Sequence, residues 1–312
     1  MKKSKVINGM GMILTALAVI FLVRRMMALN VDFAKLITPV NIAMIVMMPF
    51  LSVMVIFINA YCWKLHLELF SKKTVEPGKS FRAYAQANVM KYLPGNIGHY
   101  AGRQLFGTEI GLKQAELIKA SVLEIIYSTL SMLCCCVLFC VPNIIGKTEQ
   151  WFTAEFFLKT AAGVGIFFIF ASTVFYCLRK HRYASVCLSF IQSYAFWKTF
   201  LMSLLLCSFG TILLAMEYVV LLGQYGIVDF HQMFILLSAN YISVFIGFVT
   251  PGAPGAIGVR EAVLIKMMSP FFQEDLIILA AVTHRIILIL GDLFAVPVSR
   301  MFVLCNQDED KR

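Results

Sequence analysis

Residues 91–103 read KYLPGNIGHYAGR, and residues 250–262 read TPGAPGAIGVREA. Both stretches contain the pattern PGxIG, which begins at Pro94 in the first and at Pro254 in the second, an offset of 254 − 94 = 160 residues. Proline and glycine at this density stop a helix. Each stretch therefore predicts two helices joined by a sharp turn, and the repetition predicts a chain built from two related halves.

The composition of the chain is that of a membrane protein. Of its 312 residues, 60% are apolar and 14% are charged, and the mean hydropathy is +0.82. A soluble domain is about 45–50% apolar and about 25% charged. This balance excludes an ordinary soluble enzyme, a disordered chain and a nucleic-acid-binding module. The formal net charge of +10 comes from basic residues between apolar runs, a pattern typical of cytoplasmic loops that face anionic lipid.

Six apolar runs are long enough to cross a bilayer, which takes about 20 residues per span. They are Val6–Val23, Val40–Tyr61, Leu117–Val141, Phe156–Leu178, Phe200–Leu222 and Leu276–Val298. Basic residues are concentrated before the first run and after the second, fourth and sixth, so the positive-inside rule places both termini in the cytoplasm. No small-x-small cleavage site follows the first run, which we interpret as an uncleaved span. We expect a single all-α membrane domain over residues 1–312, in the plasma membrane.

Two segments do not fit as simple spans, residues 81–111 and residues 232–270. Irregular backbone at membrane depth survives only inside protein or against a water-filled cavity, so we predict a re-entrant helical hairpin in each segment. Residues 1–150 and 151–306 then each contain three crossings and one hairpin. Because three is odd, the second half enters from the opposite side, as in the inverted repeats of many secondary transporters. The Gln232–Val249 limb is long enough to cross alone, and a full span there is the alternative.

The hairpins have the chemistry of an anion site. A helix that restarts after a Pro–Gly turn presents free backbone N–H groups and the positive end of its dipole. Arginine adds a permanent charge and can grip a phosphate with two parallel hydrogen bonds. We therefore predict that the hairpins bind the headgroup of an anionic lipid, either a phospholipid or a polyprenyl-phosphate-linked lipid. The predicted binding residues are Gly95, Asn96, Gly98, His99, Arg103, Gly255, Gly258, Arg260, Glu261 and Arg285.

A structural interpretation stands beside this functional one. The glycines would allow close helix packing. The arginines would pair with Glu124, Glu217, Glu261 or Asp292 as structural locks. Charge inside a membrane is expensive, which favours a functional role for the arginines. Glu124 and Glu217 themselves are expected near span ends, in contact with the solvated interface.

The last span carries polar residues of its own. Arg285 and Asp292 are seven residues apart, so they share one helix face, which should point inward. His284 is either a proton relay or a hydrogen-bonded core histidine. The sequence contains no HExxH motif, P-loop or nucleophile elbow. The nine cysteines lie in or beside apolar runs, and we interpret them as apolar helix filler. We expect no metal, no cofactor and no enzymatic activity.

The second broken stretch resembles the PGGxGxREA signature of the lysylphosphatidylglycerol synthase transmembrane family, whose members are also called flippase-like proteins. The matching residues are Pro254, Gly255, Gly258, Arg260, Glu261 and Ala262. Lys91–Arg103 resembles the family less specifically, and Arg285 resembles a family position. The resemblance covers nearly the whole chain and implies a polytopic fold with paired re-entrant hairpins. In bifunctional members this region moves an aminoacylated phospholipid, and a cytosolic synthase domain follows it. Because this sequence ends at Arg312, we expect a stand-alone membrane domain that does not aminoacylate lipid.

These observations predict a lipid translocase that binds an anionic headgroup between two hairpins. Two alternatives remain open. The first is a non-transporting membrane partner of a lipid or glycan biosynthetic enzyme. The second is an integral membrane transferase that acts on a polyprenyl lipid through Glu261 and Asp292. A second copy of the chain or a biosynthetic enzyme is the expected protein partner.

Overall fold

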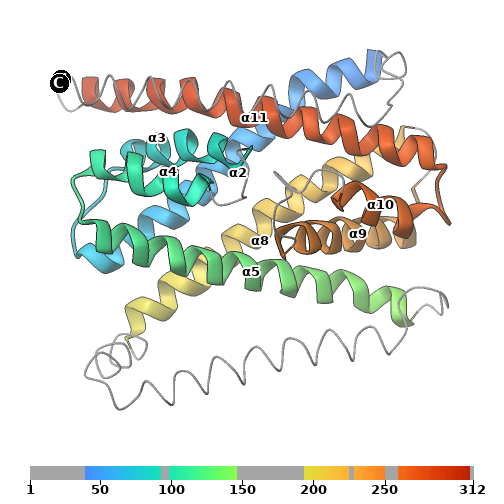
Figure 1. The fold of residues 1–312 in the computed structure, drawn as a ribbon, viewed down its shortest axis with the longest axis horizontal. Helices are drawn as coiled ribbons and strands as arrows, with labels where there is room; N and C mark the ends of the chain where they lie inside the picture. The colour runs from blue at the N-terminus through green and yellow to red at the C-terminus, as the bar shows by residue number, and fades with distance from the viewer. Residues whose placement is uncertain (1–38, 93–97, 146–192, 225–227, 250–258, 310–312) are drawn as a thin grey trace.

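The computed structural model describes residues 39–92, 98–145, 193–224, 228–249 and 259–309, and their regular structure is entirely helical. The long helices are α2 (Pro39–Ser71), α5 (Gln114–Ile145), α8 (Tyr194–Gly223), α9 (Phe230–Val249) and α11 (Glu274–Glu309). The short ones are α3 (Pro77–Asn88), η2 (Val89–Tyr92), α4 (Gly98–Gly107), η3 (Thr108–Ile110) and α10 (Val259–Met268). The all-α prediction is confirmed for this part of the chain (Figure 1).

Five helices in the described residues are long and apolar enough to cross a membrane. They run over Pro39–Ser71, Gln114–Phe139, Tyr194–Gly223, Phe230–Gly247 and Glu274–Leu304. Four of them correspond to predicted spans, whereas the predicted spans Val6–Val23 and Phe156–Leu178 lie outside the described residues. The fifth is α9, so the limb that was predicted as half of a hairpin also has the length of a full span. The protein is a multi-pass membrane protein.

The long helices expose apolar residues and bury polar ones. On α2, Met47 and Phe50 are exposed, while Asn41, Ser52 and His66 are buried. This distribution suits helices whose outer faces contact lipid and whose inner faces make polar contacts within the protein. Among the described candidate spans, α11 has the largest buried share, and it packs on α2, α3, α8 and α10.

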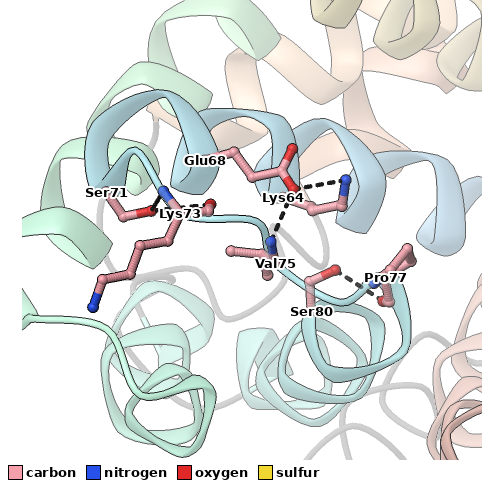
Figure 2. A network of polar contacts seen from close by, with 7 residues as sticks. All are labelled: Lys64, Glu68, Ser71, Lys73, Val75, Pro77 and Ser80. Carbon is pink, nitrogen blue, oxygen red and sulfur yellow. Dashed lines mark hydrogen bonds and ion pairs between the residues drawn. The ribbon is translucent and has the colours of Figure 1, made fainter. Parts of the chain in front are cut away.

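A polar network fixes the connection between α2 and α3 (Figure 2). Helix α2 ends at Ser71, and the next residue, Lys72, has a left-handed φ of 55° and donates its backbone N–H to Glu68 O at 2.9 Å. The Glu68 carboxylate accepts a hydrogen bond from the Val75 backbone N–H at 2.9 Å and forms an ion pair with Lys64 at 3.0 Å. Pro77 then begins α3, where its fixed φ suits the first helical turn. The network directs α3 back along α2, against which it packs.

Two helical pairs flank the centre of the molecule (Figure 1). Helix α3 packs on α4, and α9 packs on α10. In the first pair, α3 contacts α11 and α4 contacts α5. In the second pair, α9 contacts α5 and α10 contacts α11. In Figure 1 the two pairs lie at opposite ends, each between α11 and α5, while α2 and α8 cross between them.

Glycine permits the closest helix contacts. A Cβ atom on Gly291 of α11 would lie 2.3 Å from the Cβ of Ser52 on α2. A Cβ atom on Gly102 of α4 would lie 3.0 Å from the Ala87 Cα on α3. Only a residue without a side chain fits at either position, so α2–α11 and α3–α4 meet almost backbone to backbone.

Candidate functional site

Arg103 lies in a closed cluster formed by α3, α4 and α5. Its guanidinium forms an ion pair with Glu124 of α5, and Tyr84 of α3 donates a hydrogen bond to the same carboxylate at 2.8 Å. The guanidinium also lies 4.0 Å from the centre of the Tyr84 ring and 5.3 Å from that of Tyr100. Only 2% of Arg103 is exposed. Because its charge is balanced and enclosed, this arrangement corresponds to the structural interpretation of Arg103.

The expectation that Glu124 and Glu217 lie at the solvated interface is wrong. Glu124 is 6% exposed and Glu217 is 1% exposed. Glu124 is buried because Arg103 and Tyr84 supply the charge and the hydrogen bond that a carboxylate needs away from water. Glu217 of α8 faces His284 of α11, with 3.3 Å between Glu217 Oε2 and His284 Nε2.

Arg260 and Glu261 of α10 lie close to Arg285 of α11. Arg285 of α11 donates from Nε to Glu261 Oε1 of α10 at 3.0 Å. Arg260, the preceding residue on α10, donates from Nη2 to the side-chain oxygen of Asn240 on α9 at 3.3 Å. Its Nε is buried and has no hydrogen-bond partner. Among the residues that the structure describes, Arg260 has no ion pair with a carboxylate.

The end of the first hairpin reaches the same helix, α11. Asp292 accepts hydrogen bonds from Asn88 Nδ2 at 2.6 Å and from the Tyr92 hydroxyl, and it forms an ion pair with Lys91 Nζ at 2.6 Å. The phenol of Tyr92 is also within electrostatic reach of Arg260 and Arg285. Arg285 and Asp292 thus share one face of α11, as their spacing predicts, and each holds one hairpin.

Charge balance distinguishes Arg260 from the other cations of this site. Lys91 is balanced by Asp292, and Arg285 is balanced by Glu261. Among the described residues Arg260 has no carboxylate at ion-pair distance: its hydrogen-bond partner is the neutral amide of Asn240, and the adjacent Glu261 is paired with Arg285. As a whole residue Arg260 is only partly buried, whereas Arg103 is enclosed. A guanidinium in this position has the chemistry to pair with an anion.

The remaining predicted binding residues belong to the two PGxIG motifs or directly follow the first one. Gly98 is the first residue of α4, and the ring of His99 lies 3.9 Å from that of Tyr100. Gly95, Asn96, Gly255 and Gly258 lie outside the described residues. The described part of the chain contains no group of three metal-ligating side chains that could hold an ion.

Three contributors to this site were missed from the sequence: Asn88, Tyr92 and Asn240. The two asparagines carry a usable signal, because an amide within an apolar limb needs a partner and therefore points to a polar interior. Tyr92 has no such signal, because the apolar ring of tyrosine is enough to explain its presence in an apolar segment.

The matched region of the chain includes both hairpins and the polar face of α11. A family model described as "Lysylphosphatidylglycerol synthase TM region" matches residues 9–294. The comparisons with curated proteins and with solved structures give no match. The chain therefore belongs to the family of the lysylphosphatidylglycerol synthase transmembrane region.

Proposed function

We propose that the protein binds the phosphate of an anionic membrane lipid at Arg260 and moves that lipid between the leaflets of the plasma membrane. The observation that carries the proposal is the unbalanced charge of Arg260, beside two cations that are each paired with a carboxylate. A half-buried charge with no counter-ion is costly in a membrane. A phosphate removes this cost, and a guanidinium is the side chain that holds it with two parallel hydrogen bonds.

Movement of the lipid follows from an inverted repeat in which α2–α5 corresponds to α8–α11 and both termini are cytoplasmic. The helix contacts support this correspondence. If each helix is replaced by its counterpart in the other half, the contact of α3 with α11 becomes the contact of α9 with α5. In the same way, the contact of α4 with α5 becomes the contact of α10 with α11. Both hairpins would then be re-entrant and enter from opposite faces. Halves related in this way can rock about a central site and expose it alternately to each side.

The proposed site lies between these halves. Arg260 belongs to the second hairpin, whereas Lys91 and Tyr92 belong to the first and reach Asp292 on α11. Rocking that opens the site would separate Lys91 from Asp292 and free a second cation for the headgroup. The lipid tails would remain in the bilayer outside α2 and α8.

A transferase has less support. Its two candidate carboxylates are both engaged, Glu261 with Arg285 and Asp292 with Lys91. A carboxylate held by a cation is a weak general base. We therefore propose a transport protein without a catalytic step of its own.

A flipping assay tests this proposal. The purified protein is reconstituted into phosphatidylcholine liposomes that contain a trace of fluorescent phosphatidylglycerol, and dithionite bleaches the probe in the outer leaflet. We expect the wild type to make nearly all of the probe accessible to dithionite. Arg260→Gln should slow the rate of flipping by about ten- to a hundredfold, which is the effect of losing a charge-assisted hydrogen bond. Arg300→Gln removes an exposed arginine from α11 and should keep the wild-type rate.

Two further arms identify the ligand. Fluorescent phosphatidylcholine replaces phosphatidylglycerol to test whether net negative charge is needed, and inorganic phosphate is added to test whether a free anion competes. Equal flipping by wild type and Arg260→Gln would contradict the proposal. Arg260-dependent binding of phosphatidylglycerol without flipping would instead favour the non-transporting partner of a biosynthetic enzyme.

A further inference from the structure

A buried carboxyl–imidazole pair lies beside the arginine site and takes no part in the contacts proposed for the headgroup. Glu217 of α8 and His284 of α11 are 1% and 2% exposed, and Glu217 Oε2 lies 3.3 Å from His284 Nε2. Among the residues that the structure describes, neither Glu217 oxygen has a hydrogen-bond partner, and His284 Nδ1 has none either. His284 Nε2 also lies 3.2 Å from the backbone oxygen of Leu214. The pair is therefore enclosed, and it has donor and acceptor positions that no described protein group engages.

The groups that face this pair come from several elements. On α8 itself, the Tyr218 ring lies 4.2 Å from the imidazole. The charged groups within reach of His284 or Tyr218 are Arg260 and Glu261 on α10 and Arg285 on α11. The apolar residues packed around Tyr218 include Met44, Ile45 and Met48 of α2 and Ile235, Leu236 and Ala239 of α9. The α5 side chains pack near Met216 instead, in the cluster of Cys135, Phe139 and Tyr241.

These surroundings link the proton content of the pair to the charge at Arg260. A bare carboxylate at Glu217 is unfavourable, since neither of its oxygens accepts a hydrogen bond. A positive imidazolium at His284 is also unfavourable, because Arg260 and Arg285 are both within electrostatic reach and only Arg285 is paired with a carboxylate. An anion on Arg260 removes the remaining repulsion and makes the protonated pair favourable.

We propose that the Glu217–His284 pair takes up one proton when an anionic headgroup binds at Arg260, so that lipid movement is coupled to proton movement. The inference rests on the proposed function of Arg260. The proton comes from solution, attaches to a vacant nitrogen or oxygen of the pair, and leaves when the headgroup leaves; no bond of the lipid is made or broken. Because linkage is reciprocal, protonation of the pair strengthens headgroup binding by the same factor.

The test is the pH dependence of phosphatidylglycerol binding to the full-length protein in phosphatidylcholine nanodiscs, between about pH 5 and pH 8. A phosphodiester does not titrate in this range, unlike a phosphate monoester, whose second pKa is about 6. Any linked proton must therefore bind the protein. We expect affinity to rise as the pH falls, by up to about tenfold per pH unit for one linked proton.

Two variants assign the proton to the pair. Glu217→Gln imitates the protonated carboxyl in size and hydrogen bonding, and should bind phosphatidylglycerol with an affinity that no longer changes with pH. His284→Gln should flatten the same profile, and it serves as the second variant if Glu217→Gln folds poorly. Glu274→Gln removes an exposed carboxylate from the same helix, α11, and should keep the wild-type profile.

The outcomes separate the two claims. A wild-type affinity that is dependent on Arg260 but constant with pH would overturn the proton coupling and leave the headgroup site intact. The coupling is equally wrong if the pH dependence persists in both Glu217→Gln and His284→Gln. Failure of the wild type to bind phosphatidylglycerol at any pH would overturn the headgroup site and the coupling together.

Discussion

Arg103 and Arg260 follow the same sequence pattern but have different electrostatic environments. Arg260 lies six residues after Pro254, whereas Arg103 lies nine residues after Pro94, almost one helical turn farther from its hairpin turn. That extra turn brings Arg103 against Glu124 on α5. Arg260 meets only the amide of Asn240. One position is therefore suited to stabilise the fold and the other to bind an anion.

A stability measurement distinguishes the two arginines. Arg103→Met leaves Glu124 as a buried charge without a counter-ion and should destabilise the protein by about 3–5 kcal/mol. Replacing both partners, in Arg103→Met with Glu124→Met, removes the stranded charge and should recover most of the loss. Arg260→Gln removes an unbalanced charge and should leave the stability unchanged or higher. Thermal unfolding of the purified variants measures these differences; equal losses for Arg103→Met and the double variant would contradict the lock.

At the scale of elements, the contact between α2 and α11 sets the position of the polar face. Gly291 meets Ser52 of α2, and the next residue, Asp292, holds the end of the first hairpin. A change in the spacing of α2 and α11 would therefore move Asp292 away from Lys91. The small residue at 291 thus contributes to the site without touching a ligand.

Gly291→Ala should destabilise the protein by about 1–3 kcal/mol, because its new Cβ would overlap Ser52 Cβ. Ser52→Gly alone should cost about 0.5–1 kcal/mol, the usual effect of glycine within a helix. In combination the two changes should be less harmful than their sum, since Ser52→Gly removes the atom that clashes. Thermal unfolding of the two single variants and the double variant forms the cycle. Additive losses of stability would show that the close contact between Gly291 and Ser52 does not cause the effect of Gly291→Ala.

The sequence predicts elements better than it predicts their contacts. Proline and glycine place the breaks at the two turns, and the helices on either side, from Pro77 to Ile110 and from Phe230 to Met268, lie within four residues of the predicted bounds. The partners of the charges were not predictable from one sequence. Glu124 looks like an interfacial residue until α4 is packed on α5 and supplies Arg103, because burial depends on which helices become neighbours.

At the scale of the whole molecule, the central proposal is that the two halves have opposite orientations. In that arrangement the loop between α2 and α3 is cytoplasmic, as its lysines indicate, and the loop between α10 and α11 is on the other side. The α9 helix is long enough to span on its own. The orientation of the second half therefore has to be measured at loops whose side of the membrane depends on whether α9 is half of a hairpin or a full span.

Single cysteines in a cysteine-free background provide this measurement. Lys73→Cys and Gln273→Cys both replace exposed residues in these two loops. A membrane-impermeant thiol reagent added to intact cells should label Gln273→Cys and leave Lys73→Cys unlabelled. Inside-out vesicles should give the reverse pattern. Labelling of both residues from one side would contradict the inverted arrangement.

The two buried arginine–glutamate pairs of the described residues have opposite polarity, which bears on how the two proposed halves would assemble. In the first half the arginine is on the hairpin and the carboxylate on the long helix, Arg103 with Glu124; in the second half Glu261 is on the hairpin and Arg285 on the long helix. A hairpin that docked against the wrong long helix would set arginine against arginine, or glutamate against glutamate, in a medium that screens neither. Like charges in such contacts cost several kcal/mol. If the chain is built from two such halves, the charges disfavour the wrong pairing of a hairpin with a long helix.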